Sequence, residues 1–124
     1  MNAYFINGTY DTPSISFIPD EGKFLMSGRS LPPNVHEFYL PVLTAIDAYL
    51  KTPKEETIFE FKMDFINSSS SKILQDLFKK LDDAFKNGHQ INVKWHYKHD
   101  DYDMRELGED LTLSTTFPYE AIIY

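Results

Sequence analysis

Four consecutive serines preceded by an asparagine are the most unusual local feature of this sequence. The run Asn67-Ser68-Ser69-Ser70-Ser71 falls where an alternating apolar segment gives way to a segment with helical periodicity. Hydroxyl and amide oxygens accept hydrogen bonds from the free amides of a first helical turn, so the run is typical of a helix cap. One cap needs only one such side chain, which leaves the other hydroxyls for other chemistry.

The helical phase separates these serines into two kinds. Ser70 lies three residues before Ile73 and four before Leu74, which places it on the buried stripe. Ser68 precedes the first full turn and is expected to be exposed. A phosphate on Ser68 would meet free backbone amides, the positive end of the helix dipole and Lys72 one turn away. The residues therefore allow either a helix cap alone or a regulatory phosphorylation site that repels an acidic partner.

Two histidines and two aspartates lie close together in the segment His96–Asp101. Imidazole and carboxylate groups are metal ligands, but His96 and His99 would point to opposite faces of a strand. The chain has no cysteine, and thiolates are common ligands in structural zinc sites. A metal-binding or small-ligand-binding module that uses His96–Asp101 is therefore the alternative to a solvated strand end followed by a helix cap.

Acidic residues continue beyond this segment. They are Asp100, Asp101, Asp103, Glu106, Glu109 and Asp110. The run suits a helix whose first turn favours negative charge, and it lacks the glycine that a calcium loop requires. It is either a solvated helix face or a face for a basic partner. No nucleophile elbow, phosphate-binding glycine loop or His-Glu-x-x-His motif occurs, so neither an enzyme nor a bound cofactor is expected.

Length and charge limit the remaining classes of function. The 124 residues suit a single domain spanning 1–124, and twelve Lys and Arg against nineteen Asp and Glu give a net charge of −7. That balance argues against binding to nucleic acid or to an anionic membrane surface. No signal peptide and no apolar run of membrane-spanning length is visible, so a soluble cytoplasmic protein is expected.

Two segments, residues 58–65 and 91–98, alternate between apolar and polar side chains. Their apolar positions are Phe59, Phe61, Met63, Phe65, Ile91, Val93, Trp95 and Tyr97. The alternation predicts two strands with one buried and one wet face, so the helices should cover only one side of the sheet. The polar side either stays in water or meets another chain. It includes Glu60, Lys62, Lys94 and His96.

The clearest helix is predicted between those two strands, with a stop at Asn87-Gly88. Its apolar residues step by three and four: Ile73, Leu74, Leu77, Phe78, Leu81, Ala84 and Phe85. The charged side chains expected on the outside are Lys79, Lys80, Asp82 and Asp83. Because a helix joins them, the two strands are predicted to be parallel.

Further elements are predicted on both sides. A helix should run from about Val35 to Leu50, begin at the cap Asn34, bend at Pro41 and end at Thr52-Pro53. Before it, residues 15–18 and 23–27 flank a four-residue hairpin connection. After it, the elements are a short helix capped by Asp100 and Asp101, with Met104, Leu107 and Leu111 as its apolar residues, and a last strand over residues 119–124.

Five stretches, in this order and spacing, carry a resemblance to a known family. They are Gly8-Thr9-x-x-Thr12-Pro13, Ser27-Gly28-Arg29-Ser30-Leu31-Pro32, Glu37-Phe38-Tyr39-x-Pro41, Phe65-Ile66-Asn67-Ser68-Ser69-Ser70-Ser71-Lys72, and Trp95-x-Tyr97 followed by the acidic run to Gly108. Over nearly the whole chain the sequence resembles the SiaC-type regulatory phosphoproteins of bacteria. The resemblance implies an α/β fold similar to the STAS domain of anti-sigma-factor antagonists, with two layers, a mixed β-sheet and helices packed on one face.

The resemblance also implies a regulatory mechanism. In SiaC-type proteins a cognate kinase phosphorylates the threonine that follows the asparagine of this motif, and a phosphatase removes the phosphate. The matching residue is Ser68, with Ser69 as second choice, and the unmodified family protein binds and activates a diguanylate cyclase, which raises cyclic di-GMP and promotes biofilm. Asn67, Ser68, Ser69 and Lys72 are then expected to contact the partner. The alternative is an anti-sigma-antagonist switch whose partner is an anti-sigma kinase.

Overall fold

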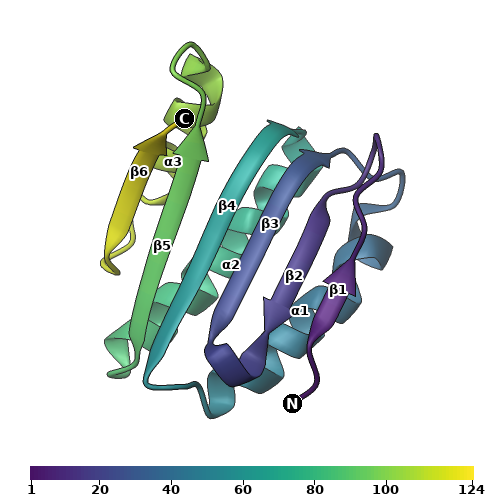
Figure 1. The fold of residues 1–124 in the computed structure, drawn as a ribbon. Helices are drawn as coiled ribbons and strands as arrows, with labels where there is room; N and C mark the ends of the chain where they lie inside the picture. The colour runs from purple at the N-terminus through teal and green to yellow at the C-terminus, as the bar shows by residue number, and fades with distance from the viewer.

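The computed structural model describes residues 1–124, which form one six-stranded sheet with three helices on a single face (Figure 1). The strands are β1 (Tyr4–Ile6), β2 (Ser14–Ile18), β3 (Lys23–Ser30), β4 (Glu56–Ile66), β5 (Gln90–Tyr97) and β6 (Tyr119–Ile123). The helices are α1 (Val35–Lys51), α2 (Ser68–Lys86) and α3 (Tyr102–Leu111), with a short 3-10 turn at Pro19–Glu21. Spatial order follows chain order. The first three strands are antiparallel and β3 to β6 are parallel. The predicted mixed sheet with helices on one face is confirmed.

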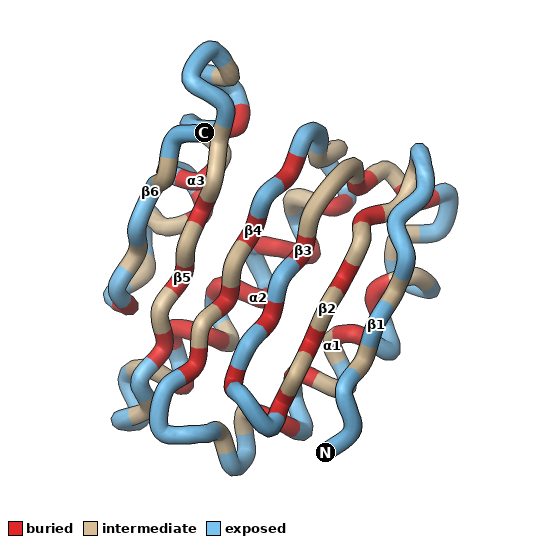
Figure 2. Tube along the Cα trace, viewed as in Figure 1, coloured by how far each residue is buried: buried red, intermediate tan, exposed pale blue.

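Buried and more exposed residues alternate along the central strands (Figure 2), which gives the sheet a buried face and an open face. One row of paired residues, Phe17, Phe24, Phe59 and Val93, crosses β2 to β5 on the helix side, and every member is buried. The neighbouring row, Leu25, Glu60 and Lys94, lies on the other side and is at least partly exposed. The strand prediction for residues 58–65 and 91–98, including their parallel pairing, is confirmed.

Phe65 is the exception to that alternation. Gly28 pairs with Met63, but Arg29 pairs with Phe65, so β4 carries one extra residue, Asp64. Such a bulge shifts the following side chain to the opposite face. The prediction that Phe65 is buried is therefore wrong, and its ring is 41% exposed beside Arg29 on the open face.

The helices begin and end close to their predicted positions. Asn34 caps α1 by accepting a hydrogen bond from the Glu37 amide at 3.1 Å, and Pro41 lies inside the helix. Helix α2 ends at Lys86 with Asn87 as its C-cap, followed by Gly88, whose φ of 99° is the left-handed conformation that glycine adopts readily. None of the three helices combines the length and hydropathy that crossing a bilayer requires.

Several details differ from the predictions. Strand β1 was not predicted, because its three residues are too few to give a pattern, and β3 continues to Ser30 instead of stopping at residue 27. Asp101 alone caps α3, through the Met104 amide at 3.0 Å, whereas Asp100 is exposed in the preceding turn.

Close contact between α3 and the sheet depends on a small residue. The Trp95 indole Nε1 donates a hydrogen bond to the Met104 carbonyl at 2.9 Å and fixes α3 over β5. Gly108 lies directly on this ring and on the Tyr119 hydroxyl, and a β-carbon at position 108 would come within 2.7 Å of the indole. Burial raises the pKa of Tyr119 to about 12. The acidic run is thereby carried on a helix that packs tightly against the core.

Candidate functional site

The first turn of α2 is capped by Asn67 and not by a serine. The Asn67 side-chain oxygen accepts a hydrogen bond from the Ser70 amide at 2.9 Å, and its carbonyl accepts one from the Ser71 amide, also at 2.9 Å. The Ser69 hydroxyl donates to the same Asn67 side-chain oxygen at 3.3 Å. Because the asparagine does the capping, no serine hydroxyl is required for it.

Ser68 is exposed at the first residue of α2, as the helical phase predicts. Its hydroxyl makes no hydrogen bond, in contrast to that of Ser69. Lys72 is also exposed, makes no ion pair, and lies four residues further along the helix, on the same side as Ser68. The residues predicted at this site, Asn67, Ser68, Ser69 and Lys72, are therefore grouped at one turn on the surface.

Ser70 faces the opposite way and is completely buried. The Ser30 hydroxyl donates to the Ser70 Oγ at 2.8 Å, and Ser70 donates to the Ser30 carbonyl at 3.2 Å. The Tyr39 hydroxyl lies 2.5 Å from the Ser30 Oγ, so this hydroxyl network joins α2, β3 and α1. Burial raises the pKa of Tyr39 against the smaller opposing effect of its bonds to Ser30 and Ser70, which keeps the network neutral. The network holds the first turn of α2 in the rotation that leaves Ser68 outside.

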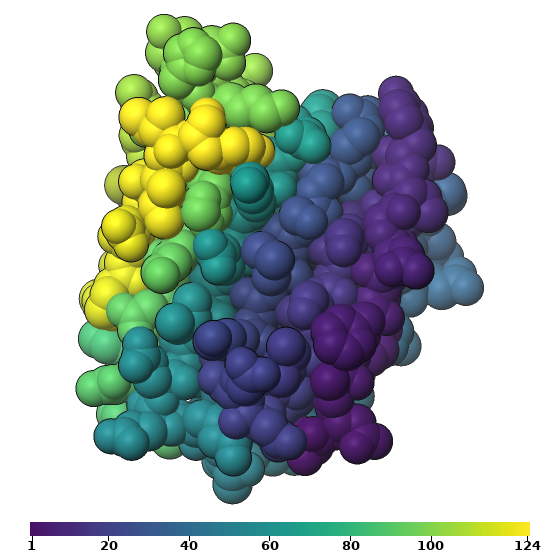
Figure 3. Space-filling model, in the orientation of Figure 1, coloured from purple at the N-terminus to yellow at the C-terminus, as the bar shows by residue number.

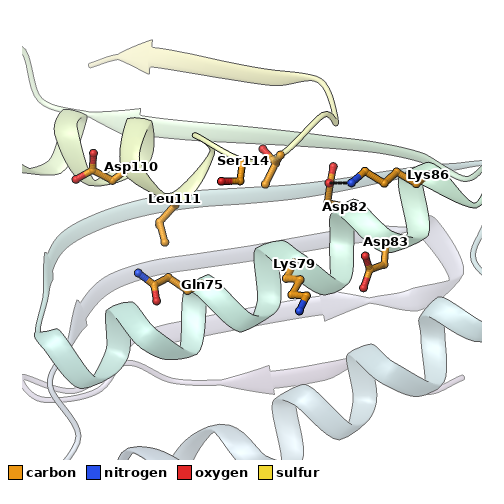
Figure 4. Close-up of a pocket in the computed structure, with 9 residues that line it drawn as sticks. Gln75, Lys79, Asp82, Asp83, Lys86, Asp110, Leu111 and Ser114 are labelled. Atoms are coloured by element: carbon orange, nitrogen blue, oxygen red, sulfur yellow. Dashed lines mark ion pairs between the residues drawn. The ribbon is translucent and has the colours of Figure 1, made fainter.

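The other end of α2 is held by a carboxylate. Asp82 was predicted to be outside, but it is buried, and one oxygen accepts hydrogen bonds from the Thr116 amide at 2.7 Å, the Thr116 hydroxyl at 2.9 Å and the Phe117 amide at 3.2 Å. Its second oxygen pairs with Lys86 at 3.2 Å (Figure 4). Burial alone would raise the Asp82 pKa, but the Thr116 and Lys86 bonds outweigh it and lower the pKa below its ordinary value.

A groove of about 390 Å³ between α2 and the end of α3 lies over this aspartate. Its lining is almost entirely polar and carries both signs of charge: Gln75, Lys79, Asp82, Asp83, Lys86, Asp110, Leu111, Ser114 and Thr115. The Asp82 oxygens that reach it are already bonded to the chain's own groups. The groove is therefore part of the contact by which Asp82 on α2 fixes the segment that leads into β6.

The possible metal ligands of the alternative site at His96–Asp101 are not brought together. The His96 Nε2 lies 2.5 Å from a Glu60 side-chain oxygen on the open face, and His99 is exposed beyond the end of β5. No group of three or more His, Cys, Asp or Glu side chains is arranged to hold a metal ion. Within the acidic run, Asp101 caps α3, and Glu109 pairs with Arg105 at 3.4 Å.

A family model for the SiaC family of regulatory phosphoproteins matches residues 6–124. The chain belongs to the SiaC family. An uncharacterized protein of Pseudomonas aeruginosa strain UCBPP-PA14 is 27% identical over 119 residues, which cover 96% of this chain and 94% of that protein.

Solved structures of P. aeruginosa SiaC are similar over the whole chain. SiaC of P. aeruginosa matches with a TM-score of 0.92 at 26% identity and covers 100% of both chains. The complex of the diguanylate cyclase SiaD with its activator SiaC contains a chain that matches with a TM-score of 0.93 at 26% identity, covering 98% of this chain and 99% of that one. The predicted family and fold are confirmed. Which residue carries a phosphate stays a prediction.

Proposed function

We propose that this chain activates a diguanylate cyclase by binding to it, and that phosphorylation of Ser68 by a cognate kinase, reversed by a phosphatase, prevents that binding. The observation that carries the proposal is the sorting of the serines. Ser68 is exposed at the start of α2 with a free hydroxyl, while Ser70 is buried and bonded to Ser30. A kinase can reach only the outward hydroxyls of this turn.

Family membership supports the choice of partner. SiaC of P. aeruginosa, which shares the fold of this chain at 26% identity, is the activator of a diguanylate cyclase in a complex of the two proteins. An activator of an enzyme needs a docking surface and not a catalytic site. That requirement suits a chain whose polar groups mostly serve caps, ion pairs and packing.

Electrostatics at the first turn explains how a phosphate could act there without unfolding the protein. The amides of Ser68 and Ser69 have no partner within the helix, and the helix dipole is positive at this end. Lys72 adds a positive charge one turn away. A phosphate with about −1.5 to −2 charges is therefore stabilised in place. The same charge and bulk oppose a partner surface that fits the bare hydroxyl, since burying an unpaired charge costs several kcal/mol.

Ser68 is favoured over Ser69 as the acceptor by one structural observation. Its hydroxyl is free, whereas the Ser69 hydroxyl is bonded to Asn67. A phosphate on Ser68 lies four residues from Lys72, a spacing at which helical side chains meet. Ser69 is three residues from Lys72, a spacing at which helical side chains also meet, so the state of the hydroxyl is what distinguishes the two serines.

The proposal is tested by installing phosphoserine at position 68, at position 69 and at the exposed control Ser114 by genetic code expansion. Binding to the diguanylate cyclase encoded in the same genome is measured by calorimetry. Phosphoserine at 68 should weaken binding at least 100-fold, while phosphoserine at 114 should change it less than twofold. Tight binding of the form phosphorylated at 68 refutes the switch.

Mapping the protein from its own cells gives an independent test. Trypsin cleaves after Lys62 and after Lys72, so it releases residues 63–72 as one peptide. Phosphate on Ser68 in part of the population is expected, and phosphate on Ser69 would move the site by one residue. If the protein binds no cyclase but captures an anti-sigma kinase, the anti-sigma-antagonist alternative replaces the cyclase.

A further inference from the structure

An arginine on the open face of the sheet lies between two aromatic rings. The Arg29 guanidinium carbon is 4.4 Å from the centroid of the Tyr10 ring and 5.3 Å from that of Phe65. Its Nε donates a hydrogen bond to the Tyr10 carbonyl at 3.0 Å. The bulge at Asp64 creates this arrangement, because without it Phe65 would turn into the core. We call Tyr10, Arg29 and Phe65 the arginine stack.

The arginine stack holds a positive charge that the chain does not neutralise. The terminal nitrogens of Arg29 make no hydrogen bond and no ion pair, although the chain contains nineteen acidic residues. The two flanking rings are also exposed, Tyr10 at 74% and Phe65 at 41%. The guanidinium is thus oriented in advance and partly desolvated, with its two-pronged end free.

The open face around Arg29 carries side chains of both charges. Its paired positions across the strands carry four basic side chains, Lys23, Arg29, Lys62 and Lys94, and three acidic ones, Glu56, Glu60 and Glu120. Glu60 is already paired with His96. No helix covers this face, which Figure 3 views directly. This face is therefore close to charge balance, although the whole molecule has a net charge of −7.

The arginine stack and the serine turn lie at the same end of the neighbouring strands β3 and β4. Phe65 is three residues before Ser68, and the Asn67 amide donates a hydrogen bond to the Ser30 carbonyl, next to Arg29, at 3.0 Å. A partner that covers one of them therefore lies beside the other. This adjacency links the chemistry of the stack to the proposed switch.

Resting on the proposed function, we infer that the arginine stack anchors the partner protein through a segment that combines a carboxylate with apolar side chains. A planar guanidinium binds a carboxylate through two parallel hydrogen bonds, and the exposed rings contact the apolar groups. Arginine and aromatic residues are the side chains that most often dominate the binding energy of interfaces. An acidic partner segment would also explain why phosphorylation weakens binding, because a phosphate on Ser68 repels a carboxylate.

The test measures the dissociation constant for the cyclase by calorimetry with Arg29→Gln, Arg29→Lys and the control Lys54→Gln. Lys54 is exposed and precedes β4, at the opposite end of the strand from Phe65. Arg29→Gln should bind at least tenfold more weakly, Arg29→Lys should also lose affinity because it lacks the planar fork, and Lys54→Gln should stay within twofold. Raising the salt concentration should weaken the unmodified protein more than Arg29→Gln.

A second probe separates this inference from the proposed function. An amphipathic peptide of glutamate and leucine, and its counterpart with glutamine for glutamate, are titrated into isotope-labelled protein while the Arg29 side-chain Nε–H signal is followed by NMR. The glutamate peptide alone should shift that signal. A shift of the Arg29 signal without cyclase binding supports carboxylate binding by the arginine stack and refutes the cyclase as the partner. Cyclase binding that Arg29→Gln does not weaken, or no shift with the glutamate peptide, refutes the anchor.

Discussion

At its N-terminal end α2 is attached to the molecule through neutral hydroxyls, and at its C-terminal end through a carboxylate. Ser70 and Ser30 exchange hydrogen bonds at the first end, whereas Asp82 holds Thr116 and Phe117 at the second. The difference suits the two tasks. The charged contact fixes a loop that carries no candidate site residue, while the neutral contact adds no fixed charge beneath a turn that is proposed to gain a phosphate.

The largest effect is expected from removing the carboxylate. Asp82→Ala leaves the buried Phe117 amide and the Thr116 amide without an acceptor, which should lower the free energy of unfolding by about 3 kcal/mol. Urea denaturation measures it, with the exposed neighbour Asp83→Ala as the control. A loss below that of the control would remove the distinction between the two ends.

A smaller loss is expected when the hydroxyl network is cut. Ser70→Ala removes the bonds to the Ser30 hydroxyl and carbonyl and should cost about 1–2 kcal/mol. The matched control is Ser69→Ala, whose hydroxyl contributes one exposed bond to Asn67. If the two variants unfold at the same urea concentration, Ser70 does not hold the turn.

Acidification should reduce the stability contributed by the C-terminal end of α2 and leave that of the N-terminal end unchanged. The Asp82 pKa is lowered on folding, so its contribution is fully present above the ordinary value of 3.8 and is lost as the pH falls through the lower folded value. The stability difference between the unmodified protein and Asp82→Asn should therefore narrow on acidification. The deficit of Ser70→Ala should stay constant over the same range, because no group in its network titrates there. Urea curves at several pH values measure both, and parallel behaviour of the two variants would contradict the comparison.

The smallest effect is expected at the proposed switch itself. Ser68→Ala removes an exposed hydroxyl without a partner and should change the free energy of unfolding by less than about 0.5 kcal/mol. Thermal melting of this variant beside Ser70→Ala measures the contrast. A Ser68→Ala variant that melts as early as Ser70→Ala would make Ser68 a structural residue.

Periodicity was sufficient to predict most of the fold. The alternating segments became β4 and β5, the residues from Ile73 to Phe85 became the apolar side of α2, and the phase of that helix placed Ser70 inside and Ser68 outside. These predictions depend on neighbours in the sequence. For the same reason the turn at Asn67 could be identified before any tertiary contact was known.

Features that depend on distant partners could not be predicted. Asp82 reads as a surface residue until Thr116 and Phe117 are brought beside it, and the inward hydroxyl of Ser70 gives no sign that Ser30 will meet it. Phe65 follows the alternation in sequence, but the pairing with β3 inserts the bulge that turns it outward. The arginine stack depends on that bulge and therefore could not be predicted from the alternation of apolar and polar residues.

The agreement between chain order and strand order has a consequence for how the protein is made. Each strand pairs with the one synthesised immediately before it, from β1 to β6, so no strand has to insert between two that are already paired. The sheet can therefore grow at one edge as the chain leaves the ribosome. Only one helix and one strand are synthesised between Ser30 and Ser70, which bond to each other. The turn that carries Ser68 can therefore form before β5 and β6 are synthesised.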